Sequence, residues 1–371
     1  MTSSPDSQPL HLRATGCRTA LGNARATCDG LLLGRRALQF LPVLGADGGD
    51  PVPLAPLPER GPAETAPPGW LPCLDALAAE IPDAPWGAAR HPVFVTSSNF
   101  GVGSLYAFQR TRDSRHLATG MPFATVEFLR QRLGWGSNVA VLSHACVSAH
   151  VGLLVAGRVL HAGLAESALV FSFDFISPFV AGGFHALKIL NGGMPAPFSD
   201  RATGSIGLGD GAAFAVLDRG RGGCRLAAQA TYNEMHHFTA NRPDGAGFAA
   251  CLEPIQAAAG GRRLWIKGHG TGTLEAGRLE AVTLARLFPE APLVSWKGSL
   301  GHTLGSCGLV ELAITIEALA SGRTPGTVAA APPCFADTVA TESFANGGYD
   351  GVILASNAFG GAHAACLLSH D

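Results

Sequence analysis

The sequence has few charged residues, and this shortage excludes several classes of protein. Charged residues make up 15% of the 371 residues, and the formal net charge is −2. A chain so close to neutral has no electrostatic footprint for nucleic acid or for an anionic membrane surface. Hydrophobic residues make up 47%, so the chain can bury a large core and long disordered stretches are not expected.

Paired-cysteine motifs and membrane signals are also missing. The nine cysteines are scattered, odd in number and include no C-x-x-C, which argues against a disulfide framework or a zinc site and favours a reducing compartment. The polar N-terminus has no signal-peptide core, and no stretch reaches 18 uninterrupted apolar residues. We therefore expect a cytoplasmic protein with no membrane span, no metal and no nucleic-acid partner.

The chain alternates short apolar runs with longer apolar segments at helical spacing, which is typical of an α/β fold. The pattern predicts strands at 11–22 (with a glycine turn), 92–96, 168–175, 213–217, 225–231, 264–267, 293–296 and 351–357. It predicts helices at 24–38, 71–81, 248–259 and 308–320, and a surface loop at 44–69. The second half repeats the layout of the first, and the repeat predicts two related α/β halves.

Cys146 lies where the apolar run 139–142 turns into the helical segment 151–160. Unpaired N–H groups and the positive end of a helix dipole favour a thiolate at such a turn. Cys146 is therefore a candidate nucleophile. Alone, it could equally be one more small buried apolar residue.

Two histidines occupy comparable strand ends, His269 after 264–267 and His302 after 293–296. A thiol with two imidazoles supports acyl transfer: the thiolate attacks a thioester, and neutral imidazoles donate hydrogen bonds to an oxygen that gains negative charge. Backbone N–H groups of the turn 357–361 are the best second oxyanion donors. Lys297 could bias a nearby protonation state. Each of these side chains also has a structural interpretation: hydrogen-bonded core histidines, a surface lysine and, for Thr271 and Thr273, helix-cap residues.

The glycine-bearing loop 97–103 follows a buried strand and could hold a phosphate. It lacks both the G-x-G-x-x-G spacing and a P-loop lysine, so it is a weak nucleotide site.

Several short segments stand in an order known from one enzyme family. They are Ala145–Ser148, Pro197–Asp200 with Gly209–Ala212, Thr239–Gly247, His269–Thr273, Lys297–His302 and Phe359–Gly361. Together they resemble the motifs of the β-ketoacyl synthases, the condensing enzymes of fatty-acid and polyketide synthesis. The resemblance covers roughly residues 11 to 368.

The resemblance implies an α/β, thiolase-like fold, with two halves in a five-layer αβαβα arrangement. Residues 11–218 would carry the nucleophilic cysteine, and residues 223–369 would carry both catalytic histidines. The implied activity is that of a 3-oxoacyl-ACP synthase type acyltransferase: decarboxylative Claisen condensation of an acyl thioester with malonyl-ACP in fatty-acid, polyketide or polyene biosynthesis. Acyl carrier protein would bring the substrates on its phosphopantetheine, with no other cofactor. The implied assembly is a homodimer, or a heterodimer with a ketosynthase-like subunit.

The resemblance also assigns roles to individual residues. Cys146 would hold the acyl group, His269 and His302 would contact the malonyl thioester, and Lys297 would support the site electrostatically. The other expected roles are phosphopantetheine binding by Thr271 and Thr273, an oxyanion hole from the N–H groups of Cys146 and Phe359, acyl gating by Phe359, and for Glu280 a place behind the catalytic residues without direct contact to substrate.

The chain departs from the family pattern in three places. Gly277 stands where the family usually has Asp, which puts in doubt a hydrogen bond near His269, although Glu280 is kept. His363 stands at the usual Asn, and the segment 100–137 is short. The acyl tunnel and the partner therefore need not be those of general fatty-acid synthesis.

Three functions stay open at this point. The first is an elongating synthase, and the second is an acyltransferase that passes the group on Cys146 to an alcohol or amine. The third is the chain-length partner of a heterodimeric synthase. The Cys-His-His set favours the first, because plain acyl transfer needs only one base, and the presence of Cys146 counts against the third.

Overall fold

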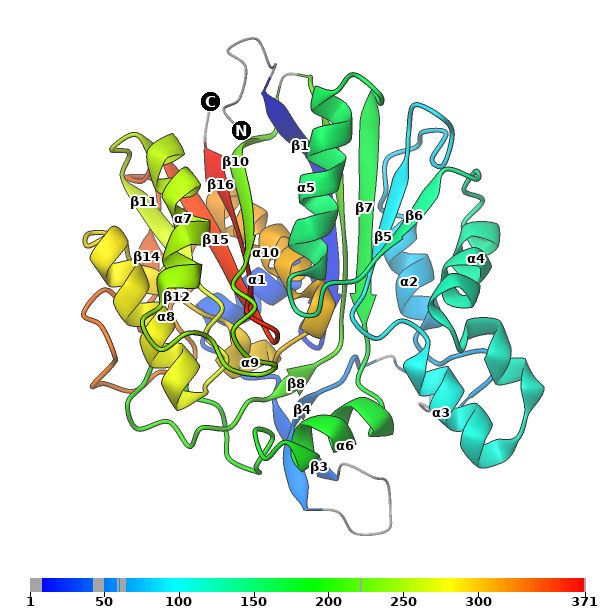
Figure 1. Ribbon diagram of the computed structural model, residues 1–371, viewed down its shortest axis with the longest axis horizontal. Helices are drawn as coiled ribbons and strands as arrows, with labels where there is room; N and C mark the ends of the chain where they lie inside the picture. The colour runs from blue at the N-terminus through cyan, green and yellow to red at the C-terminus, as the bar shows by residue number, and fades with distance from the viewer. Residues whose placement is uncertain (1–8, 43–49, 59, 61–64, 221, 370–371) are drawn as a thin grey trace.

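Eleven strands form one hydrogen-bonded sheet in the computed structural model, which describes residues 9–42, 50–58, 60, 65–220 and 222–369 (Figure 1). Most of the strands are rich in valine, alanine and leucine, as expected where helices cover both faces of a sheet. They are β1 (Leu10–Thr19), β2 (Gly22–Asn23), β5 (Val93–Thr96), β6 (Val139–Leu142), β7 (Ser167–Asp174), β9 (Gly211–Asp218), β10 (Cys224–Asn233), β11 (Leu264–Lys267), β12 (Leu293–Val294), β15 (Gly351–Ala358) and β16 (Ala362–Ser369).

The strand pairing repeats itself within this sheet. In the N-terminal part, β1 pairs with β9 and β9 with β7 antiparallel, while β7–β5 and β5–β6 are parallel. In the C-terminal part, β10–β16 and β16–β15 are antiparallel, while β15–β11 and β11–β12 are parallel. The two five-strand sets join where β1 pairs with β10, from Leu10↔Leu226 to Leu12↔Cys224. The boundaries 11–218 and 223–369 stay a prediction.

Helices cover the strands on both faces. They are α1 (Ala24–Leu32), α2 (Leu71–Ala78), α3 (Val102–Thr111), α4 (Pro122–Arg132), α5 (Ser148–His161), α6 (Pro178–Ala186), α7 (Ala246–Ala259), α8 (Leu274–Leu287), α9 (Lys297–Leu300) and α10 (Cys307–Ser321), with the 3₁₀ turns η2 (Ser114–Thr119) and η3 (Leu304–Ser306).

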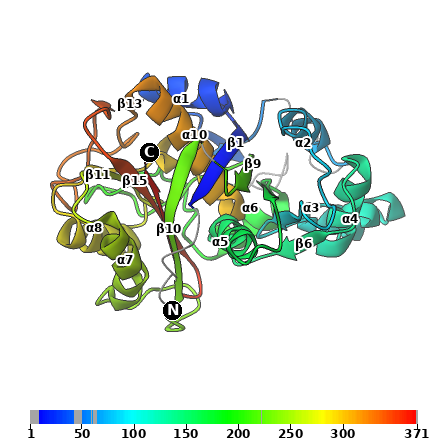
Figure 2. The ribbon, with the colours of Figure 1, turned by 90° about the horizontal axis from the view of Figure 1, so that it is seen from above.

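Two helices, α5 and α10, lie between the two strand sets. Helix α5 contacts β5 and β7 on one side and β10 and β16 on the other, and α10 contacts β1, β9 and β15. Figure 2 shows α7 and α8 outside the C-terminal strands, and α2 and α4 outside the N-terminal strands. The layers are therefore helix, strand, helix, strand, helix, which is the five-layer αβαβα arrangement of the thiolase-like fold.

The central helix α10 is unusually apolar. With η3 it spans Leu304–Ser321, a segment of 18 residues with mean hydropathy 1.5 that is long and apolar enough to cross a membrane. Because 72% of the segment is buried inside the protein, its hydropathy is that of a core helix packed between the two strand sets.

Some sequence expectations for the elements need correction. The expected loop 44–69 contains β4 (Pro51–Ala55), which pairs with β3 (Gln39–Pro42) and with β8 (Leu208–Gly209); residues 44–49, 59 and 61–64 lie outside the described part. The expected helix 24–38 ends at Leu32, because Gly34 adopts a left-handed φ of +69°. A small ladder of β13 (Arg323–Thr324) and β14 (Phe344–Ala345) completes the strands.

Candidate active site

Cys146 sits in the turn between β6 and α5, as the sequence predicts. Ala145 has a left-handed φ of +45°, a conformation that costs about 1 kcal/mol or more for a residue other than glycine. Ser148 holds this turn: its hydroxyl donates to the Ala145 carbonyl oxygen at 2.7 Å and accepts from the His144 N–H at 2.7 Å. These contacts fix the backbone around Cys146, two residues before α5 begins.

The Cys146 sulfur contacts an imidazole 156 positions away in the sequence. His302 Nε2 lies 3.0 Å from Cys146 Sγ, and both side chains are buried. The Leu304 backbone N–H donates to His302 Nδ1 at 3.2 Å. Since a backbone N–H can only donate, Nδ1 is the unprotonated nitrogen and Nε2 carries the ring proton. His302 is therefore a hydrogen-bond donor to the sulfur.

His269 stands beside His302, with the two ring centroids 4.9 Å apart and the ring planes nearly perpendicular. The Glu280 carboxylate fixes the turn that carries His269: one oxygen accepts from the His269 N–H, and the other accepts from the Gly270 N–H at 2.9 Å. Burial raises the pKa of Glu280 to about 7, although these two hydrogen bonds and two nearby lysines oppose the rise. Glu280 thus holds the backbone of the turn.

Both imidazoles are neutral at pH 7. Burial lowers the pKa of His302 well below its ordinary value, and the Lys297 and Lys267 ammonium groups add to the effect. Burial and Lys297 do the same for His269. Two neutral rings can donate hydrogen bonds to an oxygen without placing a fixed positive charge on it.

Lys297 is buried, contrary to the surface interpretation. Its ammonium donates to Glu311 Oε1 at 2.5 Å, and the ammonium of Lys267 pairs with Glu311 Oε2. Although burial opposes it, Glu311 raises the pKa of Lys297 above its ordinary value. Sequence reasoning missed Lys267 and Glu311; the available signal was a charge within otherwise apolar segments, which in a core must be paired.

Burial raises the pKa of the Cys146 thiol well above its ordinary value, and the neighbouring Cys307 adds to this. The Lys297 ammonium and a hydrogen bond from the Phe359 N–H lower it. The Cys307 thiol donates to the Cys146 carbonyl oxygen at 3.3 Å. In the substrate-free protein the helix N-terminus therefore does not by itself make Cys146 a thiolate.

A cavity of about 700 Å³ opens onto these groups. Phe184 lies against Phe359, with ring centroids 6.0 Å apart, at one wall. The loop Thr239–Gly245, which carries part of one family-like motif, lines another wall. Thr271 Oγ1 and Thr273 Oγ1 lie 3.2 Å apart. The predicted site residues that line the cavity are Cys146, His269, Thr271, Thr273, His302 and Phe359.

The departures at Gly277 and His363 have visible consequences. His269 Nδ1 is buried without a hydrogen-bond partner among the described residues. A Cβ at Gly277 would meet only the Phe335 ring, at 3.5 Å, so the chain has space but no carboxylate there. His363 Nδ1 lies 2.7 Å from Asn357 Oδ1, and its Nε2 lies 3.4 Å from Glu234 Oε2. His363 therefore links the Phe359 turn to Glu234, whose other carboxylate oxygen accepts from the Arg242 N–H of the Thr239–Gly245 loop at 2.8 Å.

The loop 97–103 is not free to hold a phosphate. Asp174 accepts from the Ser98 N–H at 3.0 Å and from the Asn99 N–H at 2.9 Å, and Ser97 Oγ accepts from the Phe100 N–H at 2.7 Å. Because these donors are already used, the nucleotide interpretation has no support.

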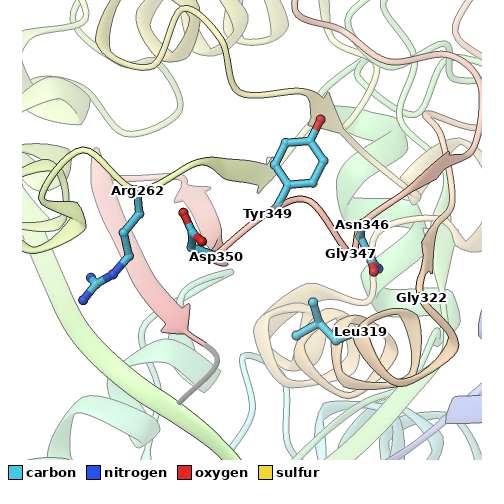
Figure 3. Close-up of a pocket in the computed structure, with 7 residues that line it drawn as sticks. All are labelled: Arg262, Leu319, Gly322, Asn346, Gly347, Tyr349 and Asp350. Atoms are coloured by element: carbon cyan, nitrogen blue, oxygen red, sulfur yellow. The ribbon is translucent and has the colours of Figure 1, made fainter.

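A second cavity, of about 690 Å³, lies at the other end of β15, with Asp350 just before that strand (Figure 3). Its lining contains Arg262, Tyr349 and Asp350 but no cysteine or histidine. The Asp350 carboxylate accepts from the Arg263 N–H at 2.8 Å. This cavity has no nucleophile for acyl transfer. Among the described residues, no group of three or more His, Cys, Asp or Glu side chains is placed to hold a metal ion.

Residues 224–330 match the family model described as the C-terminal domain of β-ketoacyl synthase. The chain is 26% identical over 321 residues to 3-oxoacyl-[acyl-carrier-protein] synthase 2 of Coxiella burnetii, covering 76% of this chain and 75% of that protein. It is 30% identical over 259 residues to the ketoacyl synthase alpha subunit of the tetracenomycin polyketide synthase of Streptomyces glaucescens, covering 62% and 60%.

Among solved structures, the chain resembles one chain of the complex of a ketosynthase with its chain length factor from Xenorhabdus doucetiae. The TM-score is 0.80, with 22% identity and complete coverage of both chains. At this identity the match supports the fold.

Proposed function

The chain belongs to the β-ketoacyl synthase family of the thiolase superfamily, and we propose that it catalyses decarboxylative Claisen condensation of an acyl thioester with a malonyl thioester carried by acyl carrier protein. One observation carries this proposal: Cys146 Sγ lies 3.0 Å from His302 Nε2, in a cavity that His269 also lines. These three side chains can hold an acyl group on the Cys146 sulfur and can donate two imidazole N–H hydrogen bonds to the carbonyl oxygen of the malonyl thioester.

In the first half-reaction the Cys146 thiolate attacks the acyl thioester carbonyl. The C–S bond to Cys146 forms, and the N–H groups of Cys146 and Phe359 hold the oxyanion. The intermediate collapses, the bond to the carrier sulfur breaks, and the proton lost by Cys146 goes to the carrier thiolate. Because burial keeps the thiol protonated in the free protein, the thiolate forms when the substrate is bound.

In the second half-reaction the imidazoles hold the malonyl thioester oxygen. His302 Nε2–H and the His269 ring donate to it, the bond to the carboxylate breaks with release of carbon dioxide, and its electron pair forms the enolate. The enolate carbon attacks the acyl group on Cys146. The oxyanion collapses, Cys146 leaves as a thiolate and takes up a proton, and the β-ketoacyl thioester stays on the carrier.

The surrounding residues support substrate delivery in this proposal. Thr271 and Thr273 line the cavity and would hydrogen-bond the phosphopantetheine arm, while Lys297 keeps positive charge near the sulfur and Phe359 gates acyl entry. No other cofactor is proposed. All nine cysteines are free, which supports a cytoplasmic location.

We also propose that the chain works as a dimer, and a ketosynthase-like partner is the form to test first. The fold matches one chain of a ketosynthase–chain length factor complex over its full length. Of the other functions, transfer to an alcohol or amine would leave the second imidazole without a use, and a chain-length partner would not need Cys146 in contact with His302.

Incubation with malonyl-ACP and a panel of acyl donors tests the proposal, with products and Cys146 adducts read by mass spectrometry. We expect carbon dioxide release and a β-ketoacyl product. Acylation of Cys146 without carbon dioxide release would indicate a non-elongating acyltransferase, and no adduct on Cys146 would indicate a chain-length partner.

A further inference from the structure

Lys267 is a fully buried cation for which the proposed reaction has no assigned use. It is the last residue of β11, two positions before His269, and its side chain is 0% exposed. Burying an ammonium group is unfavourable unless it is paired. Its position therefore needs a reason.

Two lysines share one carboxylate at this place. Lys297 and Glu311 already form a complete ion pair, at 2.5 Å, and Lys267 adds a second ammonium on the other Glu311 oxygen. A single pair would satisfy Glu311. Burial lowers the pKa of Lys267 to about 8, with Glu311 opposing the fall, so Lys267 is mostly charged at pH 7 and this group of three carries net positive charge.

Several titratable groups face this excess charge from the surrounding elements. Helix α5 contributes His150, which is buried with its Nε2 3.1 Å from Ser356 Oγ, and α8 contributes Glu280. Cys307 of α10 is also near, as are His269 and His302. For all three histidines, the Lys267 ammonium adds to the effect of burial in disfavouring the protonated ring.

We propose that Lys267 is a positioning residue for the condensation, whose charge, added to the Lys297–Glu311 pair, holds His269 and His302 as neutral hydrogen-bond donors. The consequence for turnover rests on the proposed function. An imidazolium would stabilise the malonyl carboxylate in the ground state and so oppose its loss as carbon dioxide, whereas a neutral ring favours the enolate oxygen.

Lys267→Met tests this proposal, because it removes one ammonium and leaves the Lys297–Glu311 pair intact. We expect the pKa values of His269 and His302 to rise, as followed by NMR titration of ¹³C-labelled histidine. We also expect the acid limb of the pH–rate profile to move to higher pH, so that kcat falls relative to the wild type at pH values on that limb. Lys267→Arg, which keeps the charge, should retain the wild-type histidine titration.

Ile266→Val is the matched control, since it shortens the neighbouring buried side chain of the same strand without changing charge. It should leave both titrations and the pH profile unchanged. If Lys267→Met folds, with a cooperative melt, and both histidines still titrate as in the wild type, the proposal is wrong. If Lys267→Met does not fold, Lys267→Gln and Lys267→Arg give the same comparison: equal histidine pKa values in these two variants overturn it.

The NMR titration needs no turnover, so it separates this inference from the proposed function. A wild-type protein that releases no carbon dioxide from malonyl-ACP would contradict the proposed function alone. Unchanged histidine titrations would contradict the role of Lys267 alone.

Discussion

The Cys146 turn and the His302 turn both connect a strand to a buried helix, but they are held in different ways. The Cys146 turn is fixed locally, by Ser148 on the Ala145 carbonyl oxygen and the His144 N–H. The His302 turn is fixed from the N-terminal part of the chain, because the His302 N–H donates to the Gly207 carbonyl oxygen at 2.7 Å. The nucleophile turn is thus held mainly by its own residues, with one further hydrogen bond from the Cys307 thiol of α10, whereas the histidine turn depends on a hydrogen bond from the N-terminal part of the chain.

Charge is divided as unevenly as the turns. The C-terminal part supplies both imidazoles and the ionisable groups packed behind them, Lys267, Lys297, Glu280 and Glu311. The N-terminal part supplies the sulfur, the buried ionisable groups His150 and Asp174, and a hydrophobic core dominated by aromatic rings such as Phe171 and Phe173. The reacting atom therefore lies in one part of the chain, and most of the charged groups around it belong to the other.

The largest effect should come from removing the sulfur. Cys146→Ala is expected to lower condensation at least about 10³-fold, because no other group can carry the acyl chain, and the folded structure should be retained. Product formation and acyl adducts are measured by mass spectrometry. Cys307→Ala, which removes the neighbouring thiol, should still be acylated on Cys146; condensation by Cys146→Ala at more than a few per cent of wild type would contradict the assigned role.

Next in size is the loss of the shared carboxylate. Glu311→Gln leaves two buried ammonium groups without their anion, and we expect the free energy of unfolding to fall by about 3–5 kcal/mol. Urea denaturation measures this change. Glu317→Gln, on a less buried position of the same helix, should change stability by no more than about 0.5 kcal/mol. Equal losses of stability in the two variants would mean that the ion pairs of Glu311 with Lys267 and Lys297 do not stabilise the fold.

The two turns can be compared by exchanging glycine and alanine. Gly301 has a φ of +70°, and a Cβ there would lie 2.5 Å from the Leu208 carbonyl carbon. Gly301→Ala should therefore destabilise the protein by about 2 kcal/mol or more. Ala145→Gly removes the side chain from a strained residue and should change stability by no more than about 1 kcal/mol. Thermal melts of the two variants measure the difference. A larger loss of stability in Ala145→Gly than in Gly301→Ala would show that the backbone of the His302 turn can shift to accommodate a Cβ at residue 301.

The smallest effect concerns the carboxylate under His269. Glu280→Gln keeps one acceptor and loses the other, so about 1–3 kcal/mol of stability should be lost at pH 5. The folded pKa of Glu280, about 7, lies above its ordinary value of 4.5, so the wild type loses stability as pH rises between these values. Glutamine does not titrate, so the difference in the free energy of unfolding between the wild type and Glu280→Gln should be smaller at pH 8 than at pH 5. Denaturation curves at both pH values test this; a widening gap would mean that the carboxylate is stabilised as the anion.

Much of the site could be predicted from the sequence, because the chemistry is attached to strand ends that the apolar pattern marks. Cys146, His269 and His302 each follow a predicted strand, and the structure brings all three to one cavity. Their roles are a proposal, but their convergence is a structural fact. Lys297 was predicted at the site without its partner.

The other features of the fold and the site depend on tertiary packing, which the spacing of apolar residues along the sequence does not specify. Lys267 looks like the polar end of a strand, and only the three-dimensional structure shows its ammonium on Glu311. Strand β16 was missed because its many alanines resemble a helical segment as much as a strand, and it exists through pairing with β10 and β15. Strand β4 was missed because prolines flank its apolar residues, and it pairs at the margin of the fold.

The place of β1 in the main sheet has a consequence for how the chain matures on the ribosome. This strand is synthesised before both of its neighbours in the sheet, β9 and β10. The hydrogen bonds between β1 and β10, which include the pair Leu10 and Leu226, can therefore form only after β10 has been synthesised. Until β9 is made, β1 can pair only with the two-residue strand β2, so we expect its apolar residues to be accessible to chaperones. Truncated chains that stop before Gly211 should accordingly be recovered as aggregates or chaperone-bound species.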